Sequence, residues 1–462
     1  MNFEQRCITK EELSQIWVLE ESHFVDFKSK DISPRKLSRT ISAFANASGG
    51  DIYLGIKEDN VTKEKRWEGF ENIEAANAFV QIITEQLILD NNYDLIFLRH
   101  PDLETWVLMV TVFKTQSIVW ATDKIPYVRK SAQNLPCDTV EKIRRLELDK
   151  GIVSFEDEII AESETEDLLE SNIFKLFQDN IVPHSDGTKW LKKQRLIKEN
   201  RVTVAGAMLF DDEPQILLPK RSAIKIYRYK TSNTADRDTL SAQPQTIEGD
   251  AYTQIYAAVA KTKEIIESVK ILGSGFEMVQ YPDETLHEII TNAVLHRDYS
   301  IATDIQIRIF DNRVEVESPG KLPGYVTVSN ILQAQSARNP KIVRMINKFP
   351  NAPNKDVGEG LNTAFEAMTK IRLKEPVIEE KENSVLVIIK HERLASPEEA
   401  VTDYLKTHES ITNRVGRELT GIKSENTMKR VFWKLRDADL IHMIKSGSSA
   451  AWVKNDDFFE NM

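Results

Sequence analysis

The spacing of apolar residues near the N-terminus predicts a strand, a helix and a second strand, in that order. Residues 24–28 (FVDFK) alternate between apolar and polar side chains, as a half-buried strand does. Ser33 and Pro34 then supply a helix N-cap and a first helical residue, and the apolar residues that follow keep helical spacing until the glycine pair at 49–50. Residues 51–56 (DIYLGI) predict the next strand.

Two further strands, at 95–100 and 106–113, flank the turn-like sequence PDLET and predict a hairpin. We therefore expect an α+β domain over residues 1–148. An acidic stretch at 157–171 marks the boundary to a connecting α/β region, which we place at 149–232.

The apolar run TVAGAMLF at 203–210 predicts a buried strand within the connecting region. A polar, turn-rich stretch then leads into a third domain, which we place at 233–394. Its helices are expected at 250–270 and 283–296, and its strands at 305–310, 313–317 and 384–390.

The last part of the chain, 395–462, is expected to fold as three helices followed by a strand–turn–strand with Gly447 at its tip. Ser424 caps the third helix, and its buried stripe consists of Met428, Val431, Phe432 and Leu435. Its polar positions include Lys429, Arg430 and Lys434. This order predicts a winged helix whose third helix enters the major groove of DNA. Winged helices also mediate contacts between proteins, and that alternative stays open.

Composition narrows the class of protein. A hydrophobic fraction of 41% and a charged fraction of 29% are typical of soluble multidomain chains, and 462 residues are too many for one core. The net charge of −11 argues against coating nucleic acid with the whole surface but allows a local basic face. Cys7 and Cys137 have no metal or disulfide spacing, and no signal sequence or membrane span is evident. We therefore expect a cytoplasmic protein without a membrane partner.

Three short motifs carry a first resemblance. They are ESHFVDFK at 21–28, SAFANASGG at 42–50 and GIKE at 55–58, and over roughly residues 12–135 the chain resembles the Schlafen AlbA-like domain. In nucleases of that family three carboxylates and a lysine form the cutting site. Here the resemblance implies Glu21, Asp26 and Glu58, with Lys28, around Mg²⁺ or Mn²⁺, which suits phosphodiester cleavage. Asp26 stands where glutamate is usual and Glu58 where aspartate is usual.

The same carboxylates fit a second interpretation, in which they form a solvated acidic rim on a domain that only binds nucleic acid. Under either interpretation, phosphate contacts are expected from Arg35, Lys36, Arg39, Arg129 and Lys130. A solvated helix face is the alternative role for these basic residues.

A second resemblance rests on four ordered motifs, at 284–299, 311–324, 336–342 and 357–368. They are similar to the GHKL ATPases, in the variant found at the C-terminus of RecG-related helicases, which implies an α/β sandwich that binds ATP. Glu288 and Asn292 lie four residues apart and so share one helix face. The family's roles would make Glu288 the residue that activates water and Asn292 the ligand of Mg²⁺.

Two glycines add to the resemblance to the GHKL ATPases, and one motif departs from the pattern of that family. Gly358 and Gly360 open a helix and suit a loop whose amides approach phosphates. The family's Asp-x-Gly-x-Gly box is replaced by Ser318-Pro319-Gly320, so we expect nucleotide affinity to come mainly from the phosphates. Phosphate contact is one role for Arg297, and a polar network at the helix end, shared with His296 and Asp298, is the other. A GHKL fold kept only for dimerisation or architecture is the remaining alternative.

Together these patterns predict an α+β multidomain protein that binds nucleic acid, DNA rather than RNA, in response to ATP. It would act as a transcriptional regulator or an antiphage defence effector, as a homo-oligomer. An ATP-gated, metal-dependent nuclease and an oligomeric scaffold without catalysis are the alternatives. The sequence leaves open whether the chain is an ATPase or a nuclease.

Overall fold

The chain divides into two compact units. The computed structural model describes residues 3–59, 61–218, 221–241, 243–272, 276–278, 281–353, 360–392, 397–420, 422–445 and 451–455. The first unit comprises Met1–Met368 and Glu375–Lys390, and the second comprises Thr369–Lys374 and His391–Met462. Each unit is described by itself. Within the described ranges, none of the helices combines the length and apolarity needed to cross a bilayer.

The first unit begins with a five-stranded mixed sheet. Its strand order is β1 (Glu4–Cys7), β6 (Tyr93–Arg99), β7 (Val107–Val112), β3 (Gly50–Leu54) and β2 (Val25–Lys28). The pairs β1–β6 and β2–β3 are parallel, and the other two are antiparallel, so the hairpin expected near residue 100 is confirmed. Smaller hairpins are formed by β4 (Ile56–Glu58) with β5 (Lys65–Trp67) and by β8 (Tyr127–Lys130) with β9 (Gln133–Pro136).

Helices cover both faces of this sheet. α2 (Pro34–Ala45) and α3 (Asn77–Gln81) pack on one face, and α1 (Lys10–Val18) packs on the other. α2 forms as expected because the Ser33 side chain accepts a hydrogen bond from the backbone N–H of Lys36 and Pro34 begins the helix. At Gly50, which begins β3, a Cβ atom would lie 2.3 Å from the ring of Phe44, so only glycine fits there.

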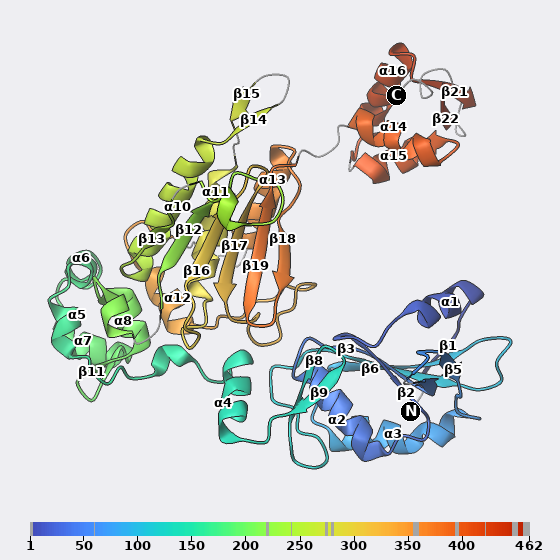
Figure 1. Ribbon diagram of the computed structural model, residues 1–462, viewed down its shortest axis with the longest axis horizontal. Helices are drawn as coiled ribbons and strands as arrows, with labels where there is room; N and C mark the ends of the chain where they lie inside the picture. The colour runs from blue at the N-terminus through green and yellow to red at the C-terminus, as the bar shows by residue number, and fades with distance from the viewer. Residues whose placement is uncertain are drawn as a thin grey trace. The chain divides into compact units, whose positions relative to one another are not determined.

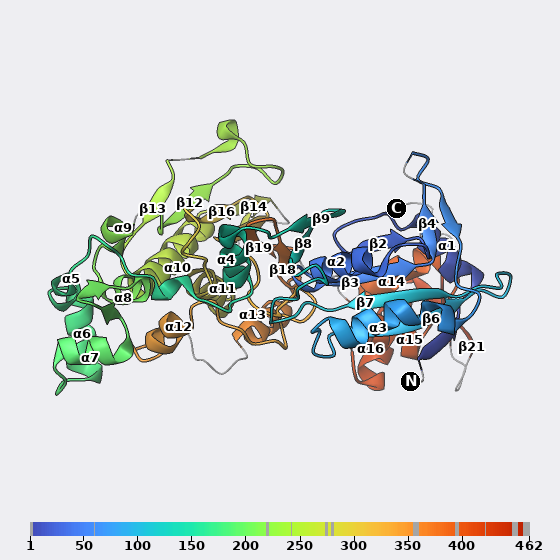
Figure 2. The ribbon, with the colours of Figure 1, turned by 90° about the horizontal axis from the view of Figure 1, so that it is seen from below.

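A helical group connects the first sheet to the second. It contains α4 (Val140–Asp149), α5 (Thr165–Leu169), α6 (Asn172–Ile181), α7 (Gly187–Gln194), α8 (Val204–Phe210) and α9 (Pro214–Leu217), with the short strands β10 (Ile197–Lys198) and β11 (Arg201–Val202). In both views α5 to α8 gather together (Figures 1 and 2).

The strand expected at 203–210 is wrong, because this segment is helix α8. Thr203 caps the helix by accepting a hydrogen bond from the backbone N–H of Gly206. All seven helical residues are buried, so the apolar run has no polar face that would reveal a helical period. A continuous apolar run of this length cannot be assigned to helix or strand by periodicity alone.

A six-stranded sheet forms the rest of the first unit. Its order is β13 (Gln245–Ile247), β12 (Ile224–Arg228), β16 (Ile305–Ile309), β17 (Arg313–Pro319), β19 (Ser384–Lys390) and β18 (Val377–Glu380). The expected hairpin of β16 and β17 and the expected strand β19 are confirmed. β12 lies before the expected boundary at residue 233, yet it pairs in parallel with β16 inside this sheet.

Two long helices pack on this sheet, α10 (Ala251–Glu267) and α11 (Asp283–Leu295), close to their expected positions (Figure 1). Two further helices are α12 (Pro340–Ile346) and α13 (Gly360–Lys370), and a short hairpin of β14 (Lys270–Leu272) and β15 (Phe276–Met278) follows α10. On β16, Ile305, Ile307 and Ile309 are buried while Gln306 and Arg308 are half-buried, so the sheet turns one face toward the core.

Charged side chains connect α4 to the part of the first unit that contains the six-stranded sheet. Asp298, which follows α11, accepts hydrogen bonds from Arg145 on α4 and from Arg338, whose NH1 atom is 3.3 Å away. The same NH1 atom donates to the carbonyl oxygen of Leu148 at 2.9 Å. Asp298 and Arg338 are almost fully buried, so this network is part of the interior of the first unit.

The second unit contains three helices and a small antiparallel sheet. Its elements are α14 (Pro397–Thr407), β20 (Ile411–Thr412), α15 (Asn413–Thr420), α16 (Glu425–Asp437), β21 (Ile441–Lys445) and β22 (Ala451–Lys454). The sheet order is β20–β22–β21. Ser424 caps α16, and the four residues of the expected stripe are buried. Phe432 from that stripe stacks on Trp452 with ring centroids 5.4 Å apart. Gly447 lies outside the described residues.

Candidate functional sites

Strand β2 and the segment before it bring two of the predicted N-terminal carboxylates together. Lys28 donates a hydrogen bond to Asp26 from two residues further along the strand, and its Nζ atom lies 3.6 Å from Oε1 of Glu21. Oε1 of Glu21 also accepts the backbone N–H of Phe27 at 3.3 Å. Burial, and then the hydrogen bond with Asp26, raise the pKa of Glu21 above its usual value.

The third predicted carboxylate does not join this cluster. Glu58, at the end of β4, pairs with Lys63 at 2.9 Å and with Lys65 at 3.7 Å. Both oxygens of Asp26 are engaged by cations, Oδ1 by Lys28 and Oδ2 by Arg129 at 3.1 Å. Among the residues that the structure describes, no three His, Cys, Asp or Glu side chains are placed to hold a metal ion. The expected three-carboxylate metal site is therefore not found among the described residues, where Glu58 pairs with Lys63 and Lys65 and not with the other two carboxylates.

Among the predicted phosphate contacts of this domain, the one assigned to Arg129 is wrong, because this side chain is buried. It is 2% exposed, its Nε and NH2 atoms donate to the carbonyl oxygen of Ser22, and its guanidinium lies over the ring of Phe44. Arg129 therefore holds the chain before β2 and does not face solvent. The strand pattern could have shown this, because Tyr127, two residues earlier on β8, is buried on the same side.

The other basic residues of that set are accessible to different degrees. Arg35 and Lys36 are exposed on the first turn of α2. Arg39 pairs with Asp123 at 2.7 Å, and Lys130 pairs with Glu382 at 2.6 Å.

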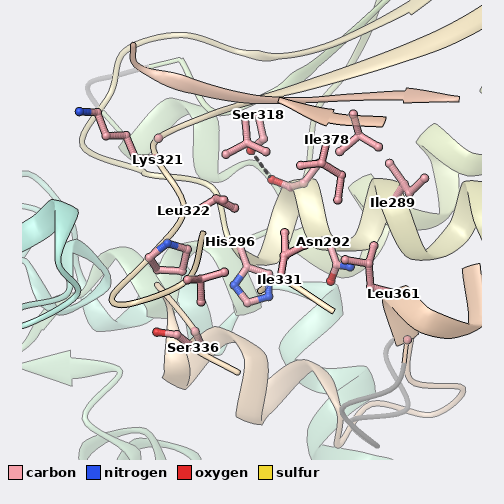
Figure 3. Close-up of a pocket in the computed structure, with 18 of the residues that line it drawn as sticks. Ile289, Asn292, His296, Ser318, Lys321, Leu322, Ile331, Ser336, Leu361 and Ile378 are labelled. Atoms are coloured by element: carbon pink, nitrogen blue, oxygen red, sulfur yellow. Dashed lines mark hydrogen bonds between the residues drawn. The ribbon is translucent and has the colours of Figure 1, made fainter. Parts of the chain in front are cut away.

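The six-stranded sheet and α11 enclose a cavity of about 410 Å³ in the first unit (Figure 3). The segment 320–337 and the start of α13 complete its walls. Apolar walls come from Ile289 and Ala293 on α11 and from Val316, Val385 and Val387 on the sheet. Four of the predicted nucleotide-binding residues line it, namely Glu288, Asn292, Gly320 and Gly360.

Glu288, Asn292 and Gly360 form the polar end of this cavity. The side-chain amide of Asn292 donates from Nδ2 to Oε1 of Glu288 at 2.9 Å, which confirms that the two lie on one face of α11. Burial raises the pKa of Glu288. A Cβ atom at Gly360 would lie 2.2 Å from Oε1 of Glu288, so the first turn of α13 closely approaches this carboxylate, and any larger residue would require the Glu288 side chain to move.

The opposite end contains Ser318 and Gly320. Ser318 donates from Oγ to the carbonyl oxygen of Ala293 at 2.7 Å, the dashed line in Figure 3. Gly320 has φ +108°, and a Cβ atom there would lie 2.6 Å from Cβ of Asp298. Among the described residues that line the cavity, Glu288 is the one that carries a carboxylate. Position 318 is a serine, so the end of the cavity at Ser318 has no acidic group from that position.

Of the two further predicted residues, Arg297 does not line the described cavity. Arg297 is 1% exposed, donates to the carbonyl oxygens of Arg221 and Thr303, and lies over the ring of Tyr299. The predicted contact of Arg297 with nucleotide phosphates is therefore wrong, and Arg297 belongs to the polar network at the end of α11. Gly358 lies outside the described residues.

His296 lines the cavity, although the sequence suggested a place in the helix-end network. Its Nδ1 atom is buried and has no hydrogen-bond partner among the described residues. Burial, and then the charge of Arg338, lower the pKa of His296 to about 4, so the ring is neutral at physiological pH. The sequence contained a signal for this position, because His296 follows Asn292 by four residues and such spacing places both side chains on one helix face.

Helix α16 carries the predicted basic residues of the second unit. Lys429 and Arg430 are exposed, with Lys429 2.7 Å from Glu425. Lys434 lies 3.1 Å from Glu398 on α14. Trp433, which the sequence analysis did not single out, is 46% exposed on the same helix.

Comparison with family models confirms both resemblances. Residues 21–138 match the family described as "Schlafen, AlbA_2", and residues 302–389 match the family described as "Putative ATP-dependent DNA helicase recG C-terminal". The second match covers the sheet side of the cavity, while Glu288 and Asn292 precede it.

Two further comparisons concern whole chains. A search of curated proteins found no match. Among solved structures, the crystal structure of the DIP2311 protein from Corynebacterium diphtheriae aligns over 97% of each chain at 16% identity with a TM-score of 0.42. That likeness is too distant to transfer a site.

Proposed function

We propose that this chain binds nucleic acid in response to a magnesium–nucleoside triphosphate. It joins a Schlafen AlbA_2 domain to a RecG-C-terminal-type domain. The nucleotide occupies the cavity between α11 and the six-stranded sheet. The observation that carries this proposal is the convergence of Glu288, Asn292 and Gly360 on one end of that cavity.

The residues at that end suit a metal–phosphate group. Because the amide nitrogen of Asn292 is committed to Glu288, its oxygen remains for a hard cation such as Mg²⁺. The first turn of α13 supplies backbone N–H groups and the positive end of an eleven-residue helix, and its glycine leaves space beside Glu288. Glu288, whose pKa is raised by burial, is suited to accept a proton from an attacking water.

Nucleic acid is proposed to contact both units. The exposed Arg35 and Lys36 on α2 suit backbone phosphates in the first unit. The second unit has the element order of a winged helix, and Lys429 and Arg430 lie exposed on its third helix, α16. Between residues 421 and 445 six Lys or Arg residues oppose three Asp or Glu, a local positive excess in a chain of net charge −11. We propose double-stranded DNA as the partner of this face.

Titration calorimetry of the full chain with ATP tests the nucleotide proposal, with and without Mg²⁺. We expect magnesium-dependent binding at millimolar ATP or below, and a change in the affinity for labelled duplex DNA when ATP is present. Absence of ATP binding at millimolar concentration rejects the nucleotide site. If DNA binding is absent as well, an oligomeric scaffold becomes the better interpretation, and light scattering would show its oligomeric state.

Strand cleavage at the N-terminal cluster is a second candidate function. It is favoured by the raised pKa of Glu21, which lies beside Asp26 and Lys28. The described side chains do not fit a divalent metal as they stand, so no step is assigned to one. Incubation with labelled DNA and tRNA, with and without Mn²⁺ and ATP, tests this candidate. A Glu21→Ala variant that cuts as well as the unaltered chain rejects it.

A further inference from the structure

Two polar residues of α11 and the residue that caps its C-terminus, His296, form one row along the cavity. Glu288, Asn292 and His296 are spaced by four residues, so each lies about 6 Å further along the same helix face. Figure 3 shows Asn292 between His296 and Leu361, which follows Gly360. The row therefore begins beside the proposed phosphate end and finishes at His296.

The far end of the row differs from the phosphate end in its chemistry. The cavity also has apolar walls, to which Val316 and Val387 from the sheet and Leu322 from the segment after β17 contribute. Apolar walls with few polar groups suit the faces of a flat aromatic ring, and the charged side chains among the described lining residues are Glu288 and Lys321. A neutral histidine carries no charge that would attract a phosphate.

His296 has unused hydrogen-bonding capacity at this end. Its Nδ1 atom is buried and lacks a partner among the described residues, and a buried polar atom without a partner is costly. A neutral imidazole offers one N–H donor and one acceptor nitrogen. Ser318, the residue at the position of the missing aspartate, has already committed its hydroxyl hydrogen to the carbonyl oxygen of Ala293.

We propose that His296 recognises the nucleobase, by hydrogen bonding to the polar edge of a purine whose faces lie against the apolar walls. This inference rests on the proposed function and names the part of the ligand that this end of the cavity binds. Because imidazole can present either a donor or an acceptor, it pairs with the amine of adenine as well as with the oxygen of guanine. The site therefore accepts both purine nucleoside triphosphates with little preference between them.

Separating base from phosphate affinity tests this proposal on the full chain. Titration calorimetry would compare ATP, GTP and inorganic tripolyphosphate, each with Mg²⁺, against the unaltered chain, His296→Ala and His296→Gln. We expect His296→Ala to weaken ATP and GTP binding by about tenfold, the size of one missing hydrogen bond, and to leave tripolyphosphate unchanged. His296→Gln, which restores a donor and an acceptor, should recover part of the affinity.

The outcomes separate this inference from the proposed function. Equal weakening of ATP and tripolyphosphate in His296→Ala would assign the histidine a structural role and overturn the inference, as would unchanged ATP affinity. A strong preference of the unaltered chain for one purine overturns the claim of tolerance. If the unaltered chain binds neither ATP nor tripolyphosphate, the proposed nucleotide site itself fails. Should His296→Ala not fold, His296→Leu, which fills the space of the ring without a hydrogen-bonding group, gives the same comparison.

Discussion

The Nζ atom of Lys114 lies 2.9 Å from the carbonyl oxygen of Leu322 and 3.0 Å from that of Val326. Lys114 follows β7 of the N-terminal sheet, and both carbonyls belong to the segment that walls the cavity. Lys114 is buried, and burial lowers its pKa. One side chain of the Schlafen AlbA_2 domain thus holds the wall of the proposed nucleotide site, and a change in that wall would reach the N-terminal sheet directly.

Replacing Lys114 with methionine should loosen this wall. Methionine keeps an apolar stem but cannot donate, so two buried carbonyl oxygens lose a partner, at a cost of about 1–3 kcal/mol in the free energy of unfolding. We expect a lower melting temperature and weaker ATP binding, measured by thermal unfolding and calorimetry. Lys36→Met, at an exposed position of α2, is the matched control. Full ATP affinity in Lys114→Met would show that the tether does not shape the site.

The stability of the first unit should depend on pH through Lys150. Its Nζ atom donates to Ala45 and Thr115, and burial followed by the charge of Lys114 lowers its pKa to about 7. Below pH 7 the lysine is protonated in folded and unfolded chains alike, so the cost of burying its charge is fully present. Between pH 7 and about 10 the folded chain loses this proton first, so the cost falls and the free energy of unfolding rises.

Lys150→Met lacks the titrating group and isolates this effect. We expect the free energy of unfolding of the unaltered chain, relative to the variant, to rise from pH 7 toward pH 10 in urea titrations. A difference between the two proteins that stays constant over this range contradicts the lowered pKa.

Two variants at the phosphate end should separate binding from hydrolysis. Asn292→Ala removes the amide oxygen proposed for Mg²⁺, so we expect magnesium-dependent ATP binding to disappear. Glu288→Gln keeps the shape of the side chain and removes its basicity, so binding should persist while any phosphate release stops. Calorimetry and a phosphate-release assay measure the two effects. Asn233→Ala, at an exposed position, is the control, and an equal decrease in both variants would point to a collapsed cavity.

The basic face of α16 should contribute to DNA affinity through phosphates. Changing Lys429 and Arg430 to glutamine should weaken duplex binding and reduce the salt slope by about one unit for each phosphate that the protein no longer neutralises. Fluorescence anisotropy at several salt concentrations measures this. Lys406→Gln with Arg414→Gln removes two charges from α14 and α15 of the same unit and should have a smaller effect. Unaltered DNA affinity in the α16 variant would favour a protein partner for this face.

Elements were predicted correctly where the residues at their ends, or the spacing within them, specify a helix. α2 formed as expected because Ser33 and Pro34 specify its first turn, and the pairing of Glu288 with Asn292 followed from helical spacing alone. α8 was missed because burial on every side removes the period that distinguishes a helix.

Site residues were harder to predict where tertiary partners decide exposure. Arg129 and Arg297 are buried, and backbone carbonyls of distant segments, those of Ser22 and Arg221, accept their N–H groups; residue type cannot reveal such partners. Glu58 pairs with Lys65 because the register of the β4–β5 hairpin places the two residues opposite each other, and the sequence motif does not reveal this partner.

The parallel pairing of β12 with β16 has a consequence for how the chain folds during synthesis. About 80 residues separate the two strands, and at roughly 5–20 residues per second a ribosome needs about 4–16 seconds to make them. β12 can pair with β13 early, since that strand follows closely, but its other edge waits for β16. An unpaired strand edge is a template for pairing with a neighbouring chain, so nascent copies on one messenger are most prone to misassociate during this interval.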